Sequence, residues 1–139
     1  MERIGVGIIG MGVGRRQAPG FLADDRVSHV VLCDNDPERL KATADELEIS
    51  DTTADWRDLM ARDDLGLISV ASPDHLHCEM SVAALDMGKH VLCEKPMAMD
   101  LVEARQMIAA VERSGKKLMV NNILRFFERF QYVKQLVES

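Results

Sequence analysis

The amino-acid sequence predicts an α/β protein with a doubly wound parallel sheet, whose helices cover both faces and so form three α/β/α layers. Short apolar segments alternate with amphipathic helical segments, which is typical of βαβ units. The first apolar segment, residues 4–9, runs directly into a glycine-rich stretch at 10–14 that opens a helical segment. An acid, Asp34, ends the second apolar segment, about 20 residues beyond these glycines. These features indicate a sheet that binds its ligand at the carboxyl ends of the strands.

The glycine-rich stretch, Gly10-Met11-Gly12-Val13-Gly14, has the composition of a phosphate-binding turn. Gly10 and Gly12 let the chain turn sharply and let an anion approach without meeting a Cβ atom. The free N–H groups and the positive dipole end of the next helix face that anion. We therefore expect Gly10, Gly12, Val13 and Gly14 to bind the diphosphate of a dinucleotide.

One position departs from the usual pattern, which has a third glycine where the helix packs closely on the strand. This chain has Arg15 at that place, and Gly14 stands one residue earlier. Two explanations remain open from the sequence. Either the helix begins differently, with Pro19 within its first turns, or the helix and strand pack more loosely.

Asp34 stands at the end of the second expected strand, residues 27–33. A carboxylate there can accept hydrogen bonds from both ribose hydroxyls, and its charge repels a 2′-phosphate. NAD is therefore favoured over NADP, which remains the alternative cofactor. The competing interpretation is that Asp34 only opens the turn Asp34-Asn35-Asp36-Pro37, whose residue types suit a turn.

The apolar segments predict five strands, at residues 4–9, 27–33, 67–71, 90–93 and 117–121. Asp36 is expected to cap the helix after the second strand, with Pro37 at its first position. The buried stripe of this helix is expected at Leu40, Ala44 and Leu47.

The later helices are marked by their ends as well as by their apolar spacing. A short helix is expected at 56–61, and a longer one ends at the terminator Gly88. Asp100 and Glu103 resemble a capping box that opens a helix ending at Gly115. The residues of this last helix expected to face the core are Leu101, Ala104, Met107, Ile108 and Val111.

The composition is that of a globular protein of one domain. The chain has 139 residues, of which 47% are hydrophobic and 29% charged. No apolar run approaches the roughly 20 residues needed to cross a bilayer, so no membrane partner is expected. The chain begins Met1-Glu2-Arg3 and enters a core strand at once, which leaves no room for a signal peptide and favours the cytoplasm.

Charge and cysteine content argue against further classes. A net charge of −6 without a basic cluster argues against nucleic acid as a partner. The three cysteines, Cys33, Cys78 and Cys93, have neither metal-ligand nor CxxC spacing, so no metal site or disulfide framework is expected. We interpret them as small buried hydrophobic residues.

Two further segments are expected at carboxyl ends of strands, beside the point where the strand order reverses. They are residues 72–77, Ser-Pro-Asp-His-Leu-His, and residues 93–96, Cys-Glu-Lys-Pro. Lys95 supplies a cation and three donors for a hydroxyl or carbonyl oxygen, and Pro96 limits the freedom of the backbone. The alternative is that Glu94 and Lys95 form only an exposed ion pair in a turn.

In combination, four features resemble the Gfo/Idh/MocA oxidoreductases, the family of glucose-fructose oxidoreductase and inositol dehydrogenase. They are the glycine-rich stretch, Asp34, residues 72–77, and the run Gly-Lys-His-Val-Leu-Cys-Glu-Lys-Pro at 88–96, which is the most specific. The resemblance covers essentially the whole chain. It implies a dinucleotide-binding Rossmann domain at 1–121 and a connecting segment with a helix at 122–139. That segment would lead to a second α+β substrate domain, which this chain lacks.

The resemblance also implies roles for residues of the site. Lys95 would lie beside the nicotinamide and touch the reacting substrate oxygen, which makes it the catalytic candidate. Glu94 would bond to the nicotinamide ribose, and Pro96 would follow a cis peptide. Arg39 would lie over the adenine, and Arg125 near the active site. The expected cofactor-binding set is completed by Asn35, Ser72, Pro73, His75 and His77.

His75 and His77 also have a structural interpretation, in which each only forms hydrogen bonds at the start of a helix. In the family the general acid and base usually come from the following sheet domain. The resemblance therefore assigns neither histidine to catalysis.

The implied activity is transfer of hydride between nicotinamide and the hydroxyl-bearing carbon of a sugar, polyol or related compound. Without the second domain, this chain is expected to bind cofactor and to turn over poorly or not at all. One alternative is a non-catalytic module that senses a dinucleotide or acts as a scaffold. Another is an S-adenosylmethionine-binding methyltransferase domain, which the context of residues 94–96 disfavours.

The last residues of the chain suggest a second partner besides the small molecules. Loss of the substrate domain would leave an apolar surface exposed near Phe126, Phe127 and Phe130. A homo-oligomer formed through this surface is a hypothesis.

Overall fold

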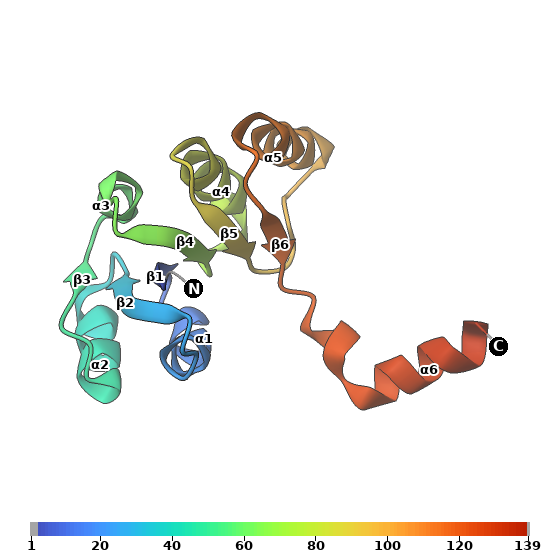
Figure 1. Ribbon diagram of the computed structural model, residues 1–139, viewed down its shortest axis with the longest axis horizontal. Coiled ribbons are helices and arrows are strands. Elements are labelled where there is room, and N and C mark those ends of the chain that lie inside the picture. Colours follow the sequence, from blue (N-terminus) through green and yellow to red (C-terminus); the bar gives the residue numbers. More distant parts are fainter. Residues whose placement is uncertain (1–2, 139) are drawn as a thin grey trace.

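The computed structural model describes residues 3–138 and contains a six-stranded parallel sheet (Figure 1). The strands are β1 (Ile4–Ile9), β2 (Val27–Cys33), β3 (Thr52–Thr53), β4 (Leu65–Val70), β5 (His90–Cys93) and β6 (Leu118–Val120). Their order in the sheet is β3-β2-β1-β4-β5-β6, so the winding direction reverses between β1 and β4. The predicted doubly wound α/β class is confirmed. The predicted cofactor-binding domain, 1–121, includes Met1 and Glu2, and the predicted connecting segment, 122–139, includes Ser139. These three residues lie outside the described residues.

Helices cover both faces of this sheet. They are α1 (Gly14–Leu22), α2 (Pro37–Leu47), α3 (Trp56–Ala61), α4 (His77–Asp86), α5 (Leu101–Ser114) and α6 (Glu128–Glu138). In Figure 1, α1 and α2 lie on one face, and α3, α4 and α5 lie on the other. The helix α6 extends away from the sheet and buries none of its described residues. The three layers are therefore formed by the chain up to β6.

The ends of the helices agree with the predicted capping signals. The Asp36 carboxylate accepts hydrogen bonds from two N–H groups in the first turn of α2, each at 3.1 Å. The Asp100 carboxylate accepts from the N–H of Glu103 at 2.9 Å, and the Glu103 carboxylate reaches back to the N–H of Met99, also at 2.9 Å. Gly115 follows α5 with a φ of 66°, a value that suits glycine.

Three strands differ from their predicted ranges. The strand β4 begins two residues earlier than expected and ends one earlier, since Leu65 already pairs with Gly5 of β1. The strand β6 lacks the first and last of its expected residues. The strand β3 was not predicted, because its two residues, which pair with Leu32 and Cys33, are too few to show a period.

Hydrophobic residues form one cluster on each face of the sheet. The larger cluster includes Ile68 and lies against α3, α4 and α5. The smaller includes Leu32 and lies against α1 and α2. The predicted stripe of α2 packs into the smaller cluster, with Leu40 buried and Ala44 and Leu47 partly buried.

Two residues predicted to face the core from α5 do not. Leu101 is 75% exposed and Ile108 is 52% exposed, so the prediction was wrong for both. The helix contacts α4 and packs into the larger cluster through a narrower face that contains the buried residues Met107 and Ala110. Because α5 covers the outer part of the sheet, its apolar stripe is wider than the surface available to bury it (Figure 1).

The helix α1 packs closely on β1 through Gly14. A Cβ atom on Gly14 would lie 2.7 Å from Cγ2 of Ile8, which is shorter than packing allows. Gly14 is the first residue of α1, Pro19 lies inside the helix, and Arg15 is exposed. The early glycine therefore takes the packing role of the missing third glycine, and the helix begins differently rather than packing loosely.

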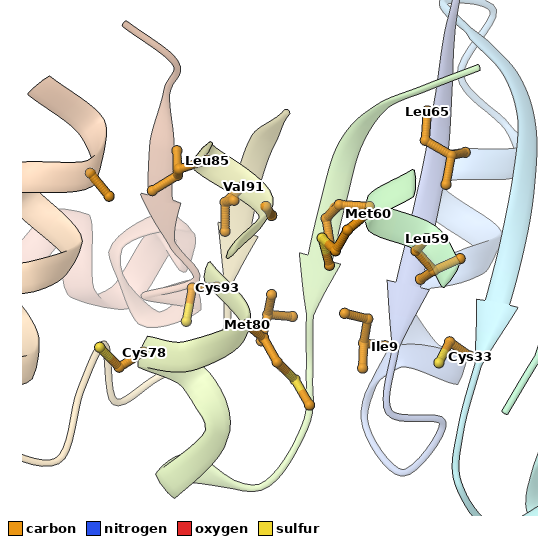
Figure 2. Packing of buried hydrophobic residues seen from close by; sticks show 14 of the residues in the cluster. Ile9, Cys33, Leu59, Met60, Leu65, Cys78, Met80, Leu85, Val91 and Cys93 are labelled. Carbon is orange, nitrogen blue, oxygen red and sulfur yellow. The ribbon is translucent and has the colours of Figure 1, made fainter. Parts of the chain in front are cut away.

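All three cysteines are free and buried, as predicted. Figure 2 shows Cys33, Cys78 and Cys93 among the apolar side chains of the larger cluster. Burial raises the pKa of Cys33 to about 12 and that of Cys93 to about 11, and it also raises the pKa of Cys78. The folded protein therefore holds almost no thiolate near neutral pH.

Replacing Gly14 should destabilise the protein, whereas replacing a second glycine of the same helix should not. We expect Gly14→Ala to lower the free energy of unfolding by about 1–3 kcal/mol, since the new methyl group overpacks the contact with Ile8. The matched control is Gly20→Ala, because a Cβ there meets nothing within 4 Å. It should raise stability by up to about 1 kcal/mol. Guanidinium unfolding curves measure both changes, and equal effects would contradict close packing at Gly14.

Thiol labelling should separate the folded from the unfolded protein. At pH 8 we expect a chromogenic disulfide reagent to react with the folded chain at least about 100-fold more slowly than with the unfolded chain, whose thiols have a pKa of about 8.5. The reaction is followed by absorbance, and the labelled peptides are located by mass. Fast labelling of Cys33 or Cys93 without unfolding would show that these thiols are not buried.

Candidate cofactor-binding site

The predicted site segments meet at one edge of the sheet. The glycine-rich stretch follows β1, residues 72–77 come soon after β4, and residues 94–96 follow β5. The carboxyl ends of β1 and β4 lie side by side where the strand order reverses. A backbone hydrogen bond of 2.8 Å from the N–H of Ala71 to the carbonyl of Ile9 continues their pairing beyond β4. The fold therefore gathers these segments where parallel sheets bind ligands.

The main chain at this edge is open to an anion. Gly10 has a φ of 91°, and a Cβ there would collide with the carbonyl oxygen of Ala71. Gly12 is exposed, and a Cβ on it would meet nothing within 4 Å. Val13 precedes α1 without forming a side-chain cap. The first turn of α1 therefore has no side chain capping its N–H groups.

Asp34 joins the glycine-rich stretch to the start of α2. Its side chain is almost fully buried, and Oδ2 accepts a hydrogen bond of 2.7 Å from the N–H of Met11. Oδ1 accepts one of 2.9 Å from the N–H of Asp36. The second bond is the turn contact of the alternative interpretation. Both roles are compatible, since a carboxylate offers about four acceptor positions.

Arg39 lies beside these carboxylates. Its Nη2 is 2.8 Å from the Asp36 carboxylate, and its Nη1 is 3.4 Å from Oδ2 of Asp34. Hydrogen bonding by the Arg39 N–H and then the charge of Arg39 hold the pKa of Asp36 below its usual value. Half of the Arg39 side chain remains exposed, as does Asn35 in the adjoining turn. A contact of either residue with the adenosine half of a cofactor remains a prediction.

His77 connects the two other loops of the site. It is fully buried, with Nδ1 2.7 Å from the carbonyl oxygen of Pro96 and Nε2 3.0 Å from that of Ser72. Its ring thus contacts protein carbonyls, so its direct contact with a cofactor remains a prediction. Pro73 and His75 are exposed in the same segment.

Glu94 is held by two amide side chains. Its Oε1 accepts a hydrogen bond of 2.8 Å from Nε2 of Gln17 and one of 2.6 Å from Nδ2 of Asn121. The next residue, Lys95, is exposed, and the Lys95–Pro96 peptide is cis, as the resemblance implied. Glu94 therefore belongs to an ordered network, and not to an isolated ion pair with Lys95.

Sequence reasoning missed three polar residues near this loop, namely Gln17, Ser69 and Asn121. Ser69 is fully buried in β4, and its hydroxyl donates a 2.6 Å hydrogen bond to Oε1 of Gln17. The available signal was a hydroxyl inside an otherwise apolar strand, since such a group needs a partner. No comparable sequence signal marks Gln17 or Asn121.

Arg125 lies in a short 3-10 helix, Ile123–Phe126, beyond β6. The side chain is exposed and lines a surface hollow together with Phe130 and Lys134 of α6. A contact between Arg125 and a ligand at the sheet edge therefore remains a prediction.

Comparison with known proteins agrees with this geometry. A sequence profile described as an oxidoreductase family with an NAD-binding Rossmann fold, Gfo/Idh/MocA, matches residues 4–122. The uncharacterized oxidoreductase YrbE of Bacillus subtilis is 32% identical over 139 residues, which cover 99% of this chain and 41% of YrbE. Within residues 3–138, no helix combines the length and the hydrophobicity needed to span a membrane.

Two solved structures are similar over nearly the whole chain. The scyllo-inositol dehydrogenase of Lactobacillus casei, solved with NAD(H) and scyllo-inositol, has a TM-score of 0.88 and 25% identity, with 99% of this chain and 41% of that chain covered. The biliverdin reductase of Synechocystis, solved with biliverdin and NADP+, has a TM-score of 0.90 and 27% identity, with 97% and 43% covered. The chain thus spans about two-fifths of the length of these relatives. From the profile match, the strand order and the glycine-rich turn, we conclude that it belongs to the Gfo/Idh/MocA oxidoreductase family and forms the NAD-binding Rossmann fold of that family.

Proposed function

We propose that the sheet edge binds NAD, and that the whole protein transfers hydride between NAD and a hydroxyl-bearing carbon of a sugar or polyol. The observation that carries the proposal is the open main chain at Gly12, which lies at the edge where residues 94–96 also emerge. The substrate class is supported by the relative solved with NAD(H) and scyllo-inositol. Because the chain spans only part of its relatives, the activity is proposed for the whole protein.

The residues at the edge fit a dinucleotide. The diphosphate would accept hydrogen bonds from the N–H groups of Gly12 and Val13, where the helix dipole adds a favourable field. The N–H groups of Gly10, Met11 and Gly14 already donate to protein oxygens. The hydroxyl of Ser72 is buried and has no hydrogen-bond partner among residues 3–138, so it supplies an unused donor beside the same turn. A Cβ on Gly10 would meet the main chain of Ser72, which places the two residues in contact.

NAD is the cofactor that we propose, with NADP as the alternative. Asp34 lies at the end of β2, where a carboxylate recognises the adenosine ribose and repels a 2′-phosphate. Arg39 reduces this repulsion because it lies 3.4 Å from the same carboxylate. The Synechocystis relative was solved with NADP+. The preference for NAD should therefore be moderate.

Lys95 is the residue that we propose for catalysis. When bound, the nicotinamide ring accepts or supplies the hydride. Lys95 would donate a hydrogen bond to the substrate oxygen and stabilise the negative charge that develops on it. The exposed side chain of Lys95 is free to reach a substrate. The proton would pass to an acid or base outside residues 3–138.

We keep the division into a cofactor domain at 1–121 and a connecting segment at 122–139 as a proposal. It is supported by the exposed aromatic side chains after β6, which include Phe126, Phe127 and Phe130. A homo-oligomer formed through this surface is the alternative proposal.

For location we propose the cytoplasm, supported by three free thiols that suit a reducing compartment.

Filling the space above Gly12 should weaken cofactor binding without unfolding the chain. We expect Gly12→Val to raise the Kd for NAD at least about tenfold, because the side chain occupies the place of the diphosphate. The melting temperature without cofactor should change little, since a Cβ on Gly12 contacts no protein atom within 4 Å. Calorimetric titration with NAD and NADP measures both affinities. Absence of binding to the unaltered chain at millimolar concentrations of both would refute the proposed cofactor site.

Removing the charge of Lys95 should slow the reaction far more than it weakens cofactor binding. In the full-length protein we expect Lys95→Ala to lower kcat/KM by about 10²–10³ for an active polyol, with the Kd for NAD changed by less than about threefold. The control is Lys41→Ala on the exposed surface of α2, which should leave the rate unchanged. Full activity of Lys95→Ala would remove the catalytic role. Binding of NAD with no turnover on any polyol tested would instead favour the sensing module.

A further inference from the structure

Glu94 is the centre of a hydrogen-bond network that joins separate elements of the fold. Gln17 comes from α1, Glu94 directly follows β5, and Asn121 directly follows β6. The amide groups of Gln17 and Asn121 both donate to Oε1 of Glu94, at 2.8 Å and 2.6 Å. Hydrogen bonds to a charged acceptor at these distances are short and strong. The carboxylate is therefore fixed by elements on both sides of the strand reversal.

Ser69 sets the orientation of the Gln17 amide. The buried hydroxyl of Ser69 donates to the Gln17 oxygen at 2.6 Å. An ionised carboxylate can only accept hydrogen bonds, so the Gln17 amide must turn its NH2 group toward Glu94 and its oxygen toward a donor. Ser69 supplies that donor. A chain of three residues thus runs from the core of the sheet to the site.

Asn121 is fixed by its own backbone. Its N–H donates a 2.8 Å hydrogen bond to the carbonyl oxygen of Cys93, the residue before Glu94. The side-chain amide of Asn121 therefore approaches Glu94 from a backbone that is already paired with the same loop. Gln17 and Asn121, each held by a separate hydrogen bond, therefore both donate to Oε1 of Glu94.

The second oxygen of Glu94 is much less engaged. Oε2 lies 3.3 Å from the N–H of Lys95, a long hydrogen bond, whereas Oε1 has two short ones. Each carboxylate oxygen has about two acceptor positions. Oε2 therefore retains capacity for a hydroxyl donor, and rotation of the carboxylate would break a short bond to Oε1.

We propose that Gln17 and Asn121 are positioning residues, which hold Glu94 so that Oε2 accepts a hydrogen bond from a hydroxyl of the nicotinamide ribose. The inference rests on the proposed function and deepens it. Since Gln17 belongs to the helix that begins at the diphosphate turn, the same network fixes the spacing between the diphosphate and the second ribose.

Ligand fragments distinguish this role from a general structural one. NAD and ADP-ribose both contain the second ribose, whereas ADP ends at the diphosphate. In the unaltered chain and in Gln17→Ala and Asn121→Ala, calorimetric titration measures the Kd of each of these three ligands. We expect both variants to bind NAD and ADP-ribose about tenfold more weakly, because a charge-assisted hydrogen bond loses its orientation. The Kd for ADP should stay within about twofold, which also shows that each variant is folded.

A double variant tests whether the effect passes through Glu94. In a Glu94→Ala background, adding Gln17→Ala should weaken NAD binding by no more than about twofold, since the oriented group is already absent. Gln135→Ala, on the exposed surface of α6, is the matched control and should bind all three ligands normally.

Each result decides a different claim. Equal weakening of ADP and NAD in Gln17→Ala and Asn121→Ala would show a displaced α1 and overturn the positioning role. Unchanged binding of NAD in both variants would overturn it as well. If the unaltered chain binds ADP, ADP-ribose and NAD with the same affinity, only the contact between Glu94 and the second ribose is refuted. An unaltered chain that binds none of the ligands would refute the proposed function itself.

Discussion

The site depends on how closely the main chain packs against its neighbours where β1 turns into α1. At Gly10 a methyl group would collide with the carbonyl of Ala71, and at Gly14 it would lie 2.7 Å from a methyl group of Ile8. The first contact holds the turn against the segment after β4, and the second holds α1 against β1. Gly12, between them, is left uncovered. Close packing at Gly10 and Gly14 thus fixes the turn, and the missing side chain of Gly12 leaves its outer surface open to an anion.

Two carboxylates, those of Asp34 and Glu94, then hold the segments around this open surface in place. Asp34 binds the glycine-rich turn from one side through the N–H of Met11, and Glu94 binds α1 from the other side through Gln17. Each carboxylate is held by protein donors before any ligand is present, and the proposed function adds a ribose hydroxyl as a further donor to each. Carboxylates held in this way need little rearrangement when a hydroxyl arrives, which reduces the entropy cost of binding.

Local signals predicted most of the fold. Strand periodicity, the Asp36 and Asp100 caps and the glycine terminators depend on neighbouring residues alone, so the sequence reveals them. The failures were of another kind. Leu101 and Ile108 were misplaced because the width of the buried face of α5 is decided by what lies beside it, and β3 was missed because an edge pair depends on a partner strand. In the site, residues with strong local chemistry such as Glu94 were found. Gln17 and Asn121 were not, because only the folded chain brings an amide from α1 and one from the residue after β6 to the same oxygen.

His77 limits how far the loops after β4 and β5 can move apart. One rigid imidazole ring connects the loop after β4 to the loop after β5, with a carbonyl contact on each side and no exposed surface of its own. A neutral imidazole donates from one nitrogen only, so the ring holds the loops through one hydrogen bond and through the packing of a fully buried ring, and separating the loops would disrupt that packing. Space for a bulkier ligand is therefore gained more easily by replacing exposed side chains near His77 with smaller ones than by moving the two loops apart. The buried ring therefore sets the spacing between the loops, whereas the exposed residues that they carry can change without disturbing it.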